Sequence, residues 1–586
     1  MKRKKDSKPT APRSQKRPVP GNFAHSAGAT LRSYTVGALP ILNRIIARMK
    51  LEKFLRHFVV EDKRCTLSPV VGVLILVRNY LVSREPIYGL EEWARQYVPS
   101  LLGVEAGQIA RLNDDRVGRC LDRLFAADCS ALVLEITRHV VEEFGVDLSE
   151  LHNDSTTITF SGAYEGTEQE TRAFGKKVPA VTWGKNKDHR PDLKQLLYNL
   201  TVSSDGAIPV AFGVENGNVT DDQTHRANWD LLCRIVGSPN FIYVADSKLA
   251  THANMTHIAN RGGRFISVLP ATRSEDKAFR QRVHEGGVEW EEIERKHNEA
   301  GELENIISTA KETGTTSEGF RLLWYHSTRG AEIDRWTRAK AIRRGFASLT
   351  ALRLKLRSPR TRYHEKSQVE KAVAKRLSEC GATEWITVQI LPEEREVYVQ
   401  KSPGRPGRNT DYRKEIRTRF SITFDVNREH VEEAERQDGI FPLVTNDREL
   451  SVKEVLEIYK RQPALEKRFS QLKTQFHVAP VFLKLVHRIV ALLTAYYLAL
   501  LVQAILEREL RRAMKKAKLA FLPLYPEERT CRAPTTRRVI DLFEHVQLHE
   551  LRPADGGPAL RFVTDLSELQ RALLKLLGVP ETDYEA

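Results

Sequence analysis

Three acidic residues stand where a chain of alternating strands and helices could bring them together. Asp154 lies in the strand-like run LHNDSTTITFSG, Asp246 ends the short apolar run FIYVAD, and Glu466 lies in a charged helical stretch. Carboxylates are hard oxygen ligands that suit Mg²⁺ or Mn²⁺. Two such ions can activate a water or a 3′-hydroxyl and stabilise the leaving oxygen of a phosphodiester. The ordered set of three acids therefore favours a metal-dependent phosphodiester site.

Each acid taken alone also has a purely structural explanation. Asp246 could cap the helix that follows it, and Asp154 could be a polar residue at a sheet edge. Glu466 could pair with an Arg or Lys on a solvated helix. These alternatives stay open for the single residues, and the choice depends on the rest of the chain.

The stretch YKRQPALEKRFSQLK places Tyr459, Glu466 and Lys473 seven residues apart, which is close to two turns of an α-helix. Pro463 suits the first turn of a helix and disfavours helical geometry at the residue before it. We therefore expect Tyr459 to close one helix and Glu466 to lie on the next. Ser451 begins a Ser-x-x-Glu capping box that predicts the start of the earlier helix. Glu466 and Lys473 are expected to share one face of the later helix.

The surrounding pattern predicts an α/β frame. Residues 31–148 are dominated by helical periodicity and are interpreted as an N-terminal helical domain. Residues 149–270 follow the order strand, hairpin, helix, strand, helix and strand, which describes a mixed sheet. Residues 271–449 form a long insertion of strands and helices, and residues 450–518 resume the helical layer. The tail, 519–586, contains prolines and ends in a helical pattern.

Composition points to a polyanionic partner in a reducing compartment. The chain has 92 Lys and Arg against 76 Asp and Glu, a net charge of +16, and the excess is concentrated in residues 1–30, interpreted as a disordered basic arm. Such a charge most often indicates nucleic acid. The six cysteines form no C-x-x-C pair, so neither a zinc cage nor a disulfide framework is indicated. The basic start lacks an apolar stretch and is not a secretory signal.

One apolar run, IVALLTAYYLALLVQAIL at residues 489–506, is long enough to cross a membrane. It contains a threonine, two tyrosines and a glutamine, and a strongly charged segment follows it. We expect a buried core helix and no membrane association.

Several of these residues resemble the DDE transposases of bacterial insertion sequences, of the insertion-sequence-four type. Tyr459, Glu466 and Lys473 fit the Tyr-x2-Arg-x3-Glu-x6-Lys signature of that superfamily. The stretches DSTTITFSGAY, GKNKDHRPDLKQLLYNLTVSSDGAIPV and YVADSKLAT resemble a large branch of it. The signature's arginine does not fit, because Gln462 holds its place and Arg461 stands one position early. The resemblance runs from about residue 35 to about residue 510.

The resemblance implies a ribonuclease-H-like catalytic core, a mixed sheet flanked by helices, formed by residues 149–270 and 450–518. The β-rich α+β insertion at 271–449 would interrupt this core, and the helical domain at 31–148 would bind DNA. The implied reaction is Mg²⁺-dependent nicking at the ends of a mobile element, followed by attack of the freed 3′-hydroxyl on target DNA.

The resemblance also implies roles for single residues. Asp154, Asp246 and Glu466 would hold two Mg²⁺ or Mn²⁺ ions per active site. Lys473, Tyr459 and Arg461 would contact DNA phosphate near the cut. The partners would be double-stranded DNA, as terminal inverted repeats and target, and a second copy in a homodimer on the ends. The compartment would be the cytoplasm, with association to the nucleoid.

Weaker signals add candidates for DNA contact. Lys187 and Arg190 lie in the basic loop GKNKDHRPDLKQ, which is either a DNA contact or an ordinary solvated loop. Asp188 and Asp192 in this loop are lesser candidates for metal ligands. Arg405 is the centre of SPGRPGR, which resembles minor-groove hooks but also suits a plain linker.

Two further functions stay open. The same core could be a stand-alone nuclease that cuts without joining, or the chain could be a non-catalytic DNA-binding descendant of a transposase. The three intact acids argue against the second of these.

Overall fold

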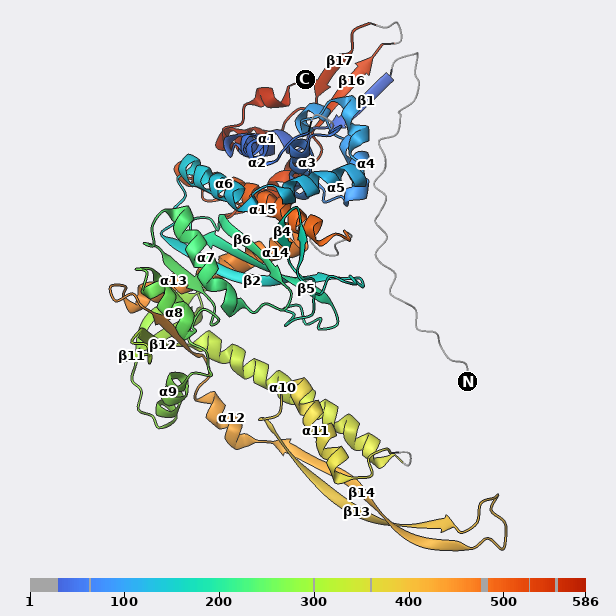
Figure 1. The fold of residues 1–586 in the computed structure, drawn as a ribbon. Coiled ribbons are helices and arrows are strands. Elements are labelled where there is room, and N and C mark those ends of the chain that lie inside the picture. Colours follow the sequence, from blue (N-terminus) through green and yellow to red (C-terminus); the bar gives the residue numbers. More distant parts are fainter. Residues whose placement is uncertain are drawn as a thin grey trace. The chain divides into compact units, whose positions relative to one another are not determined.

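The computed structural model describes residues 30–62, 65–298, 301–358, 361–475, 483–525, 527, 529–553 and 557–585 (Figure 1). These residues divide into two compact units. The first unit takes its described residues from Met1–Ala245, His257–Arg264 and Lys460–Ala586, and the second from Asp246–Thr256 and Phe265–Tyr459. The basic arm predicted for residues 1–30 lies outside the described residues, apart from Thr30.

The first unit contains the predicted N-terminal helices. Asn113 accepts a hydrogen bond from the Arg116 amide at 3.0 Å and caps α5 (Asp114–Ala126). Asp128 accepts one from the Ala131 amide at 3.1 Å and caps α6 (Cys129–Phe144). The other elements of this region are α1 (Leu39–Arg48), α2 (Leu51–Phe58), α3 (Pro69–Val82), α4 (Leu90–Arg95) and the 3₁₀ turns Ile87–Gly89, Pro99–Leu102 and Ala106–Arg111.

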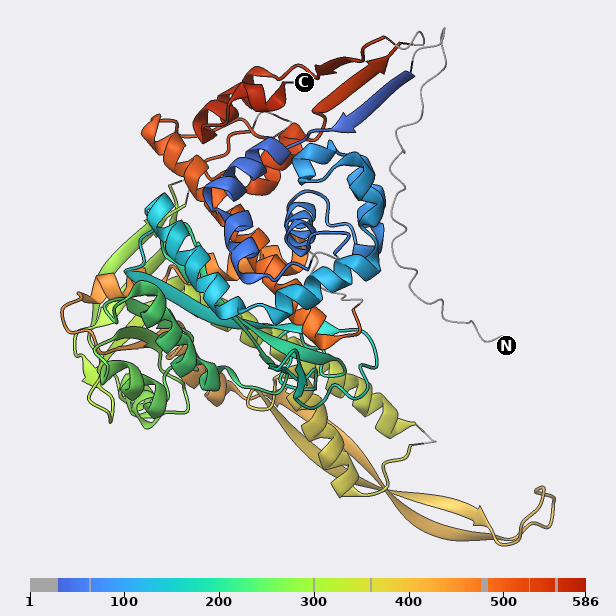
Figure 2. The ribbon, with the colours of Figure 1, turned by 45° about the horizontal axis from the view of Figure 1, so that its top comes forward.

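The two ends of the described chain meet in a small sheet of the first unit. β1 (Thr30–Thr35) pairs antiparallel with β16 (Gln547–Arg552), which pairs antiparallel with β17 (Leu560–Val563), as Figure 2 shows. The helical periodicity of the N-terminal region did not predict β1, because its partner strand lies at the other end of the sequence. The tail ends in the expected helix and also contains strands; its remaining elements are α16 (Thr536–Phe543), α17 (Glu568–Leu577) and the 3₁₀ turn Glu581–Tyr584.

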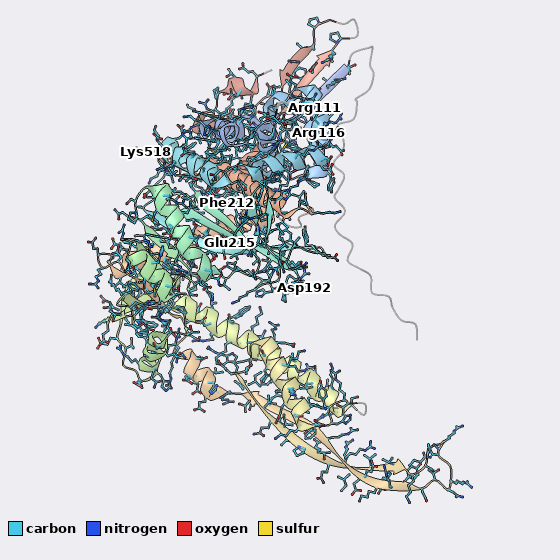
Figure 3. All side chains as sticks on the ribbon, in the orientation of Figure 1. Arg111, Arg116, Asp192, Phe212, Glu215 and Lys518 are labelled. Carbon is cyan, nitrogen blue, oxygen red and sulfur yellow. The ribbon has the colours of Figure 1, made fainter. Side chains whose placement is uncertain are left out.

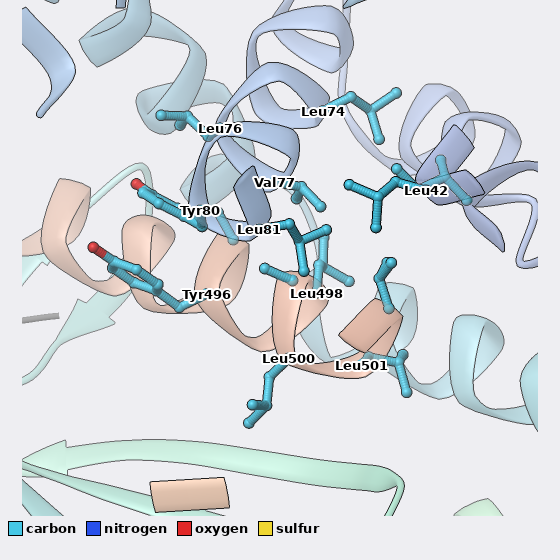
Figure 4. Packing of buried hydrophobic residues seen from close by; sticks show 14 of the residues in the cluster. Leu42, Leu74, Leu76, Val77, Tyr80, Leu81, Tyr496, Leu498, Leu500 and Leu501 are labelled. Carbon is cyan, nitrogen blue, oxygen red and sulfur yellow. The ribbon is translucent and has the colours of Figure 1, made fainter. Parts of the chain in front are cut away.

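The core of the first unit is built around α15 (Val486–Lys516), which packs against α1, α3, α5 and α17. Figure 4 shows leucines of α3 and α15 facing one another, with the rings of Tyr80 and Tyr496 stacked at 4.0 Å between centroids. Among the described residues α15 is the helix long and apolar enough to cross a membrane, but 94% of its most apolar window is buried inside the protein. Because it is buried, α15 is a helix of the protein core. Burial of each of its large apolar side chains contributes about 1.5 to 3 kcal/mol to the stability of the fold.

The sheet of the first unit has the strand order β6-β5-β2-β7. β2 (Glu150–Phe160) pairs antiparallel with β5 (Lys194–Ser203) and parallel with β7 (Ile242–Ala245), so the sheet is mixed, as predicted. β5 and β6 (Pro209–Asn216) form the predicted hairpin, whose turn needs the positive φ of 80° at Gly206. Helices flank this sheet: α6, α7 (Asp221–Val236) and α15 pack against β6. β3 (Thr171–Ala173) and β4 (Lys176–Val178) form a short antiparallel hairpin.

The strands of the second unit have the order β8-β15-β12-β10-β9, and the pairings recorded between these neighbours are antiparallel. Its strands are β8 (Arg264–Val268), β9 (Trp290–His297), β10 (Leu303–Ala310), β11 (Gly314–Thr315), β12 (Arg321–Ser327) and β15 (Ile440–Thr445). Its helices include α9 (Ser274–His284), α10 (Thr328–Arg357), α11 (Lys366–Cys380) and α12 (Arg428–Glu435).

A long two-stranded ribbon extends from the second unit. β13 (Ile386–Gln400) and β14 (Tyr412–Val426) pair antiparallel over their full length. Pro392 lies within β13, which a ribbon tolerates because each strand has an edge without a partner strand. The ribbon begins packed against α10 and α11. Its outer part extends beyond these two helices, and side chains project from it on both sides (Figures 1 and 3).

Candidate active site

Asp154 lies in the middle of β2 with its side chain about a quarter exposed. Its Oδ1 accepts a hydrogen bond from the Ser155 amide at 2.7 Å and lies 3.5 Å from Nζ of Lys187. Lys187 also donates to the Ser155 carbonyl at 2.7 Å and lies 2.9 Å from Oδ2 of Asp221. Asp154 is thus a central strand residue, because β5 and β7 flank β2, and the edge-strand explanation does not apply.

Asp246 follows β7 in the chain. The parallel register pairs Asn153 of β2 with Ala245 of β7, and Asp154 and Asp246 are the next residues of the two segments. Oδ1 of Asp246 accepts a hydrogen bond from the Lys248 amide at 3.1 Å, within a turn. α8 (His252–Ala259) begins only at His252, so Asp246 does not cap it.

The helix boundaries around Glu466 follow the sequence signals. Ser451 and Glu454 form the predicted capping box: the Ser451 amide donates to Glu454 at 2.8 Å, and the Glu454 amide donates to the Ser451 hydroxyl at 3.2 Å. α13 (Val452–Tyr459) ends at Tyr459, and α14 (Pro463–Ser470) begins at the proline, as predicted. The expectation of non-helical geometry before the proline is wrong, because Gln462 has a helical φ of −50° and ψ of −38°. Glu466 is exposed on α14, and its side chain makes no hydrogen bond or ion pair to any described residue.

The shared helical face of Glu466 and Lys473 requires a correction. α14 ends at Ser470, and Lys473 lies in a π-helical turn, Gln471–Gln475. A π-turn holds more residues than an α-turn, so a spacing of seven residues no longer places the two side chains one above the other. Nζ of Lys473 instead lies 2.7 Å from Oδ1 of Asp188, in the loop before β5.

Arg461 and Gln462 attach the start of α14 to β2. Arg461 donates to both carboxylate oxygens of Glu150, at 2.7 and 2.5 Å. The same carboxylate lies 2.7 Å from Nε2 of His152, whose Nδ1 lies 2.9 Å from Oε1 of Gln462. Nε2 of Gln462 donates to the Asn153 carbonyl at 3.2 Å, one residue before Asp154. The residue in place of the signature arginine therefore binds the strand that carries the first acid.

This network predicts a pH dependence. Burial opposes ionisation of Glu150, but the hydrogen bonds from His152 and Arg461 outweigh it and lower the pKa of the carboxyl below its usual 4.5. A lowered folded-state pKa contributes stability that is present above pH 4.5 and is lost as the pH falls through the folded value. We expect the β2 amides to be less protected from hydrogen exchange in Glu150→Gln than in the native chain at pH 7, and this difference in protection to disappear as the pH falls below 4.5. A difference in protection that does not change with pH over this range would exclude the ion pair as its source.

The remaining candidates for DNA contact lie in two loops. Arg190 pairs with Asp192 (labelled in Figure 3) at 2.7 Å in the exposed loop before β5. Arg405 is exposed in the loop that joins β13 to β14, in the second unit. Among the described residues no group of three or more His, Cys, Asp or Glu side chains is close enough together to hold a metal ion. The roles of all predicted site residues therefore stay predictions.

Two residues beside Asp154 were not in the predicted site. Asp221 and Ser155 share the Lys187 ammonium with it. The run VTDDQ at the start of α7 is typical of a helix start with acids in its first turn. The interaction of such acids with the helix dipole already explains Asp221, so the local sequence gives no sign of a functional role for it.

Comparison with known families agrees with this arrangement. Residues 149–502 match the transposase DDE domain family, and residues 31–138 match a domain of unknown function, DUF4277. The first match covers more than half of the 586 residues, so the chain belongs to the transposase DDE domain family. A search of curated proteins found no match. The family resemblance predicted from the sequence is confirmed, and with it the assignment to DNA transposition and recombination.

Proposed function

We propose that the protein is a transposase that nicks DNA at the ends of an insertion sequence and joins the freed 3′-hydroxyl ends to target DNA. Asp154, Asp246 and Glu466 are the proposed metal-holding carboxylates of a ribonuclease-H-like core. The observation that carries the proposal is the parallel register of β2 and β7, which makes Asp154 and Asp246 the next residues after the pair Asn153 and Ala245.

The donors around Asp154 fit a cation. Two carboxylates, a main-chain carbonyl and a hydroxyl surround the Lys187 ammonium, and oxygens of these kinds are the ligands that Mg²⁺ and Mn²⁺ prefer. When bound, two such ions would activate a water or the 3′-hydroxyl of the DNA and would stabilise the leaving oxygen of the phosphodiester.

The protein's own part is to position groups and to bind DNA. Gln462 and Arg461 hold the start of α14 against β2, which orients Glu466 relative to Asp154. Lys473, Lys187, Arg190, Tyr459 and Arg405 are proposed to contact the DNA backbone. A homodimer bound to two element ends, in the cytoplasm at the nucleoid, completes the proposal.

The test is a strand-transfer assay with DNA that carries the inverted repeats flanking the gene. Joined products support a transposase, whereas cut products that are never joined support the stand-alone nuclease. End binding without cutting supports the non-catalytic descendant.

We expect removal of the divalent metal to separate binding from chemistry. Excess chelator should abolish nicking and joining, because the carboxylates alone cannot activate a 3′-hydroxyl, while a gel-shift assay should still detect binding to the ends. Restored Mg²⁺ or Mn²⁺ should recover cleavage, and Ca²⁺ at equal ionic strength controls for charge screening. Cleavage that continues in excess chelator would contradict the metal-dependent mechanism.

A further inference from the structure

The ammonium of Lys187 occupies the position of a bound cation in the first unit. Four oxygens surround Nζ: the Ser155 carbonyl at 2.7 Å, the Ser155 hydroxyl at 2.8 Å, Oδ2 of Asp221 at 2.9 Å and Oδ1 of Asp154 at 3.5 Å. These oxygens come from the middle of β2 and the first residue of α7. The lysine side chain carries its ammonium on a flexible four-carbon stem, so it can move into and out of the space between these four oxygens.

Asp221 is held ready to accept a cation. The Ser155 hydroxyl donates to its Oδ1 at 2.5 Å, which leaves Oδ2 directed at Lys187.

The loop that carries Lys187 faces two environments. The Lys187 amide donates to the hydroxyl of Thr157 at 3.2 Å, which anchors the loop to β2. Lys185, Lys187 and His189 are all exposed, the Lys187 side chain to 33%, and Asp188 binds Lys473. A phosphate that approaches the exposed side would offer Lys187 a second anionic partner within the length of its side chain.

Charge matching decides which cation suits the four oxygens. Asp154 and Asp221 together carry two negative charges, which one ammonium balances only by half. A divalent ion balances both and takes carbonyl and hydroxyl oxygens as neutral ligands. Lys187 and a divalent ion therefore compete for the same oxygens.

We propose that Asp221 forms a divalent-cation site with Asp154 and the Ser155 carbonyl, and that the Lys187 ammonium holds this site until DNA phosphate draws it away. The proposal rests on the proposed function for the role of Asp154. It adds a fourth carboxylate to the proposed set. It also makes metal binding depend on bound DNA. The metal ion and the DNA phosphate both require the Lys187 ammonium to leave the four oxygens, so each strengthens the binding of the other.

The experiment measures Mn²⁺ binding to the DNA-free full chain, from the electron paramagnetic resonance signal of free Mn²⁺. Lys187→Met should bind Mn²⁺ at least 10-fold more tightly than the native chain. The matched control Lys185→Met removes an exposed lysine of the same loop and should stay within twofold of it. In the Lys187→Met background, Asp221→Asn should cancel the gain, whereas Asp222→Asn, at the next position of α7, should retain it.

A second measurement needs no substitution, in case Lys187→Met does not fold. A DNA duplex with the end repeat, corrected for Mn²⁺ bound by the DNA itself, should raise the Mn²⁺ affinity of the native chain at least fivefold. Equal Mn²⁺ affinity of Lys187→Met and Lys185→Met, or a gain that survives Asp221→Asn, would overturn the proposal. The DNA-free titration contains no cleavage step, so its result stands whether or not the strand-transfer assay succeeds.

Discussion

Glu466→Gln should lower nicking and joining by at least two orders of magnitude while end binding is retained. The amide keeps the size of the side chain but removes the negative charge that a divalent ion requires. A 100-fold loss corresponds to about 2.7 kcal/mol of transition-state stabilisation. Glu466 makes no hydrogen bond or ion pair to the residues that the structure describes, so the substitution breaks no observed contact and should change stability by less than about 1 kcal/mol. Single-turnover cleavage of end DNA measures the effect.

Glu457→Gln is the matched control for this loss. Glu457 lies on α13 and pairs with Lys453 at 4.0 Å, so its substitution removes one surface charge and should leave the rates unchanged. Lys473→Ala should give a smaller loss that added Mg²⁺ does not repair, because an ammonium is not a metal ligand. A Glu466→Gln chain that folds, binds the ends and joins them at the native rate would remove Glu466 from the catalytic set.

Local signals predicted the elements that carry the candidate site. The capping box at Ser451, the start of a new helix at Pro463 and the hairpin of β5 and β6 are determined by neighbours in the sequence, so they could be predicted without tertiary contacts. The apolar run that became α15 was also interpretable, because its polar residues and charged continuation favoured a core helix.

Long-range partners could not be predicted. Lys473 was placed on an α-helical face, but the chain widens into a π-turn after Ser470 and directs it to Asp188. Arg461 was expected at phosphate, and its described partner is Glu150, more than 300 residues earlier. β1 could not be predicted for the same reason, because its partner strand, β16, lies near the other end of the sequence. Periodicity reports which residues face a core and carries no information about which distant residue completes a contact.

A buried ion pair fixes the helix that carries Glu466. Arg468, with a side chain 2% exposed, donates to Oε2 of Glu507 on α15 at 3.0 Å. It also donates to the carbonyls of Gly206 and Ala207 in the β5–β6 turn, each at 2.9 Å. Glu507 accepts a further hydrogen bond from the Thr536 amide, at the start of α16. The pair therefore joins α14, α15, the hairpin turn and the C-terminal region of the first unit.

Glu507→Gln should destabilise this region by about 3 to 5 kcal/mol, because it leaves a buried guanidinium without its counter-charge. A chain with two units has no single free energy of unfolding, so hydrogen exchange of the α14 amides is the appropriate measurement. The double variant Arg468→Met/Glu507→Leu should be less destabilised than Glu507→Gln, because it removes both buried charges together.

Glu52→Gln is the matched control for the buried pair. Glu52 pairs with Arg56 one turn along α2, and both side chains are about half exposed, so this substitution should cost less than about 0.5 kcal/mol. Cleavage should follow the exchange data, because a loosened α14 no longer holds Glu466 at a fixed position relative to β2. Equal exchange protection of α14 in Glu507→Gln and Glu52→Gln would contradict this prediction. It would show that the hydrogen bonds from Arg468 to the hairpin turn are enough to stabilise α14, and that the charge of Arg468 needs no buried counter-charge.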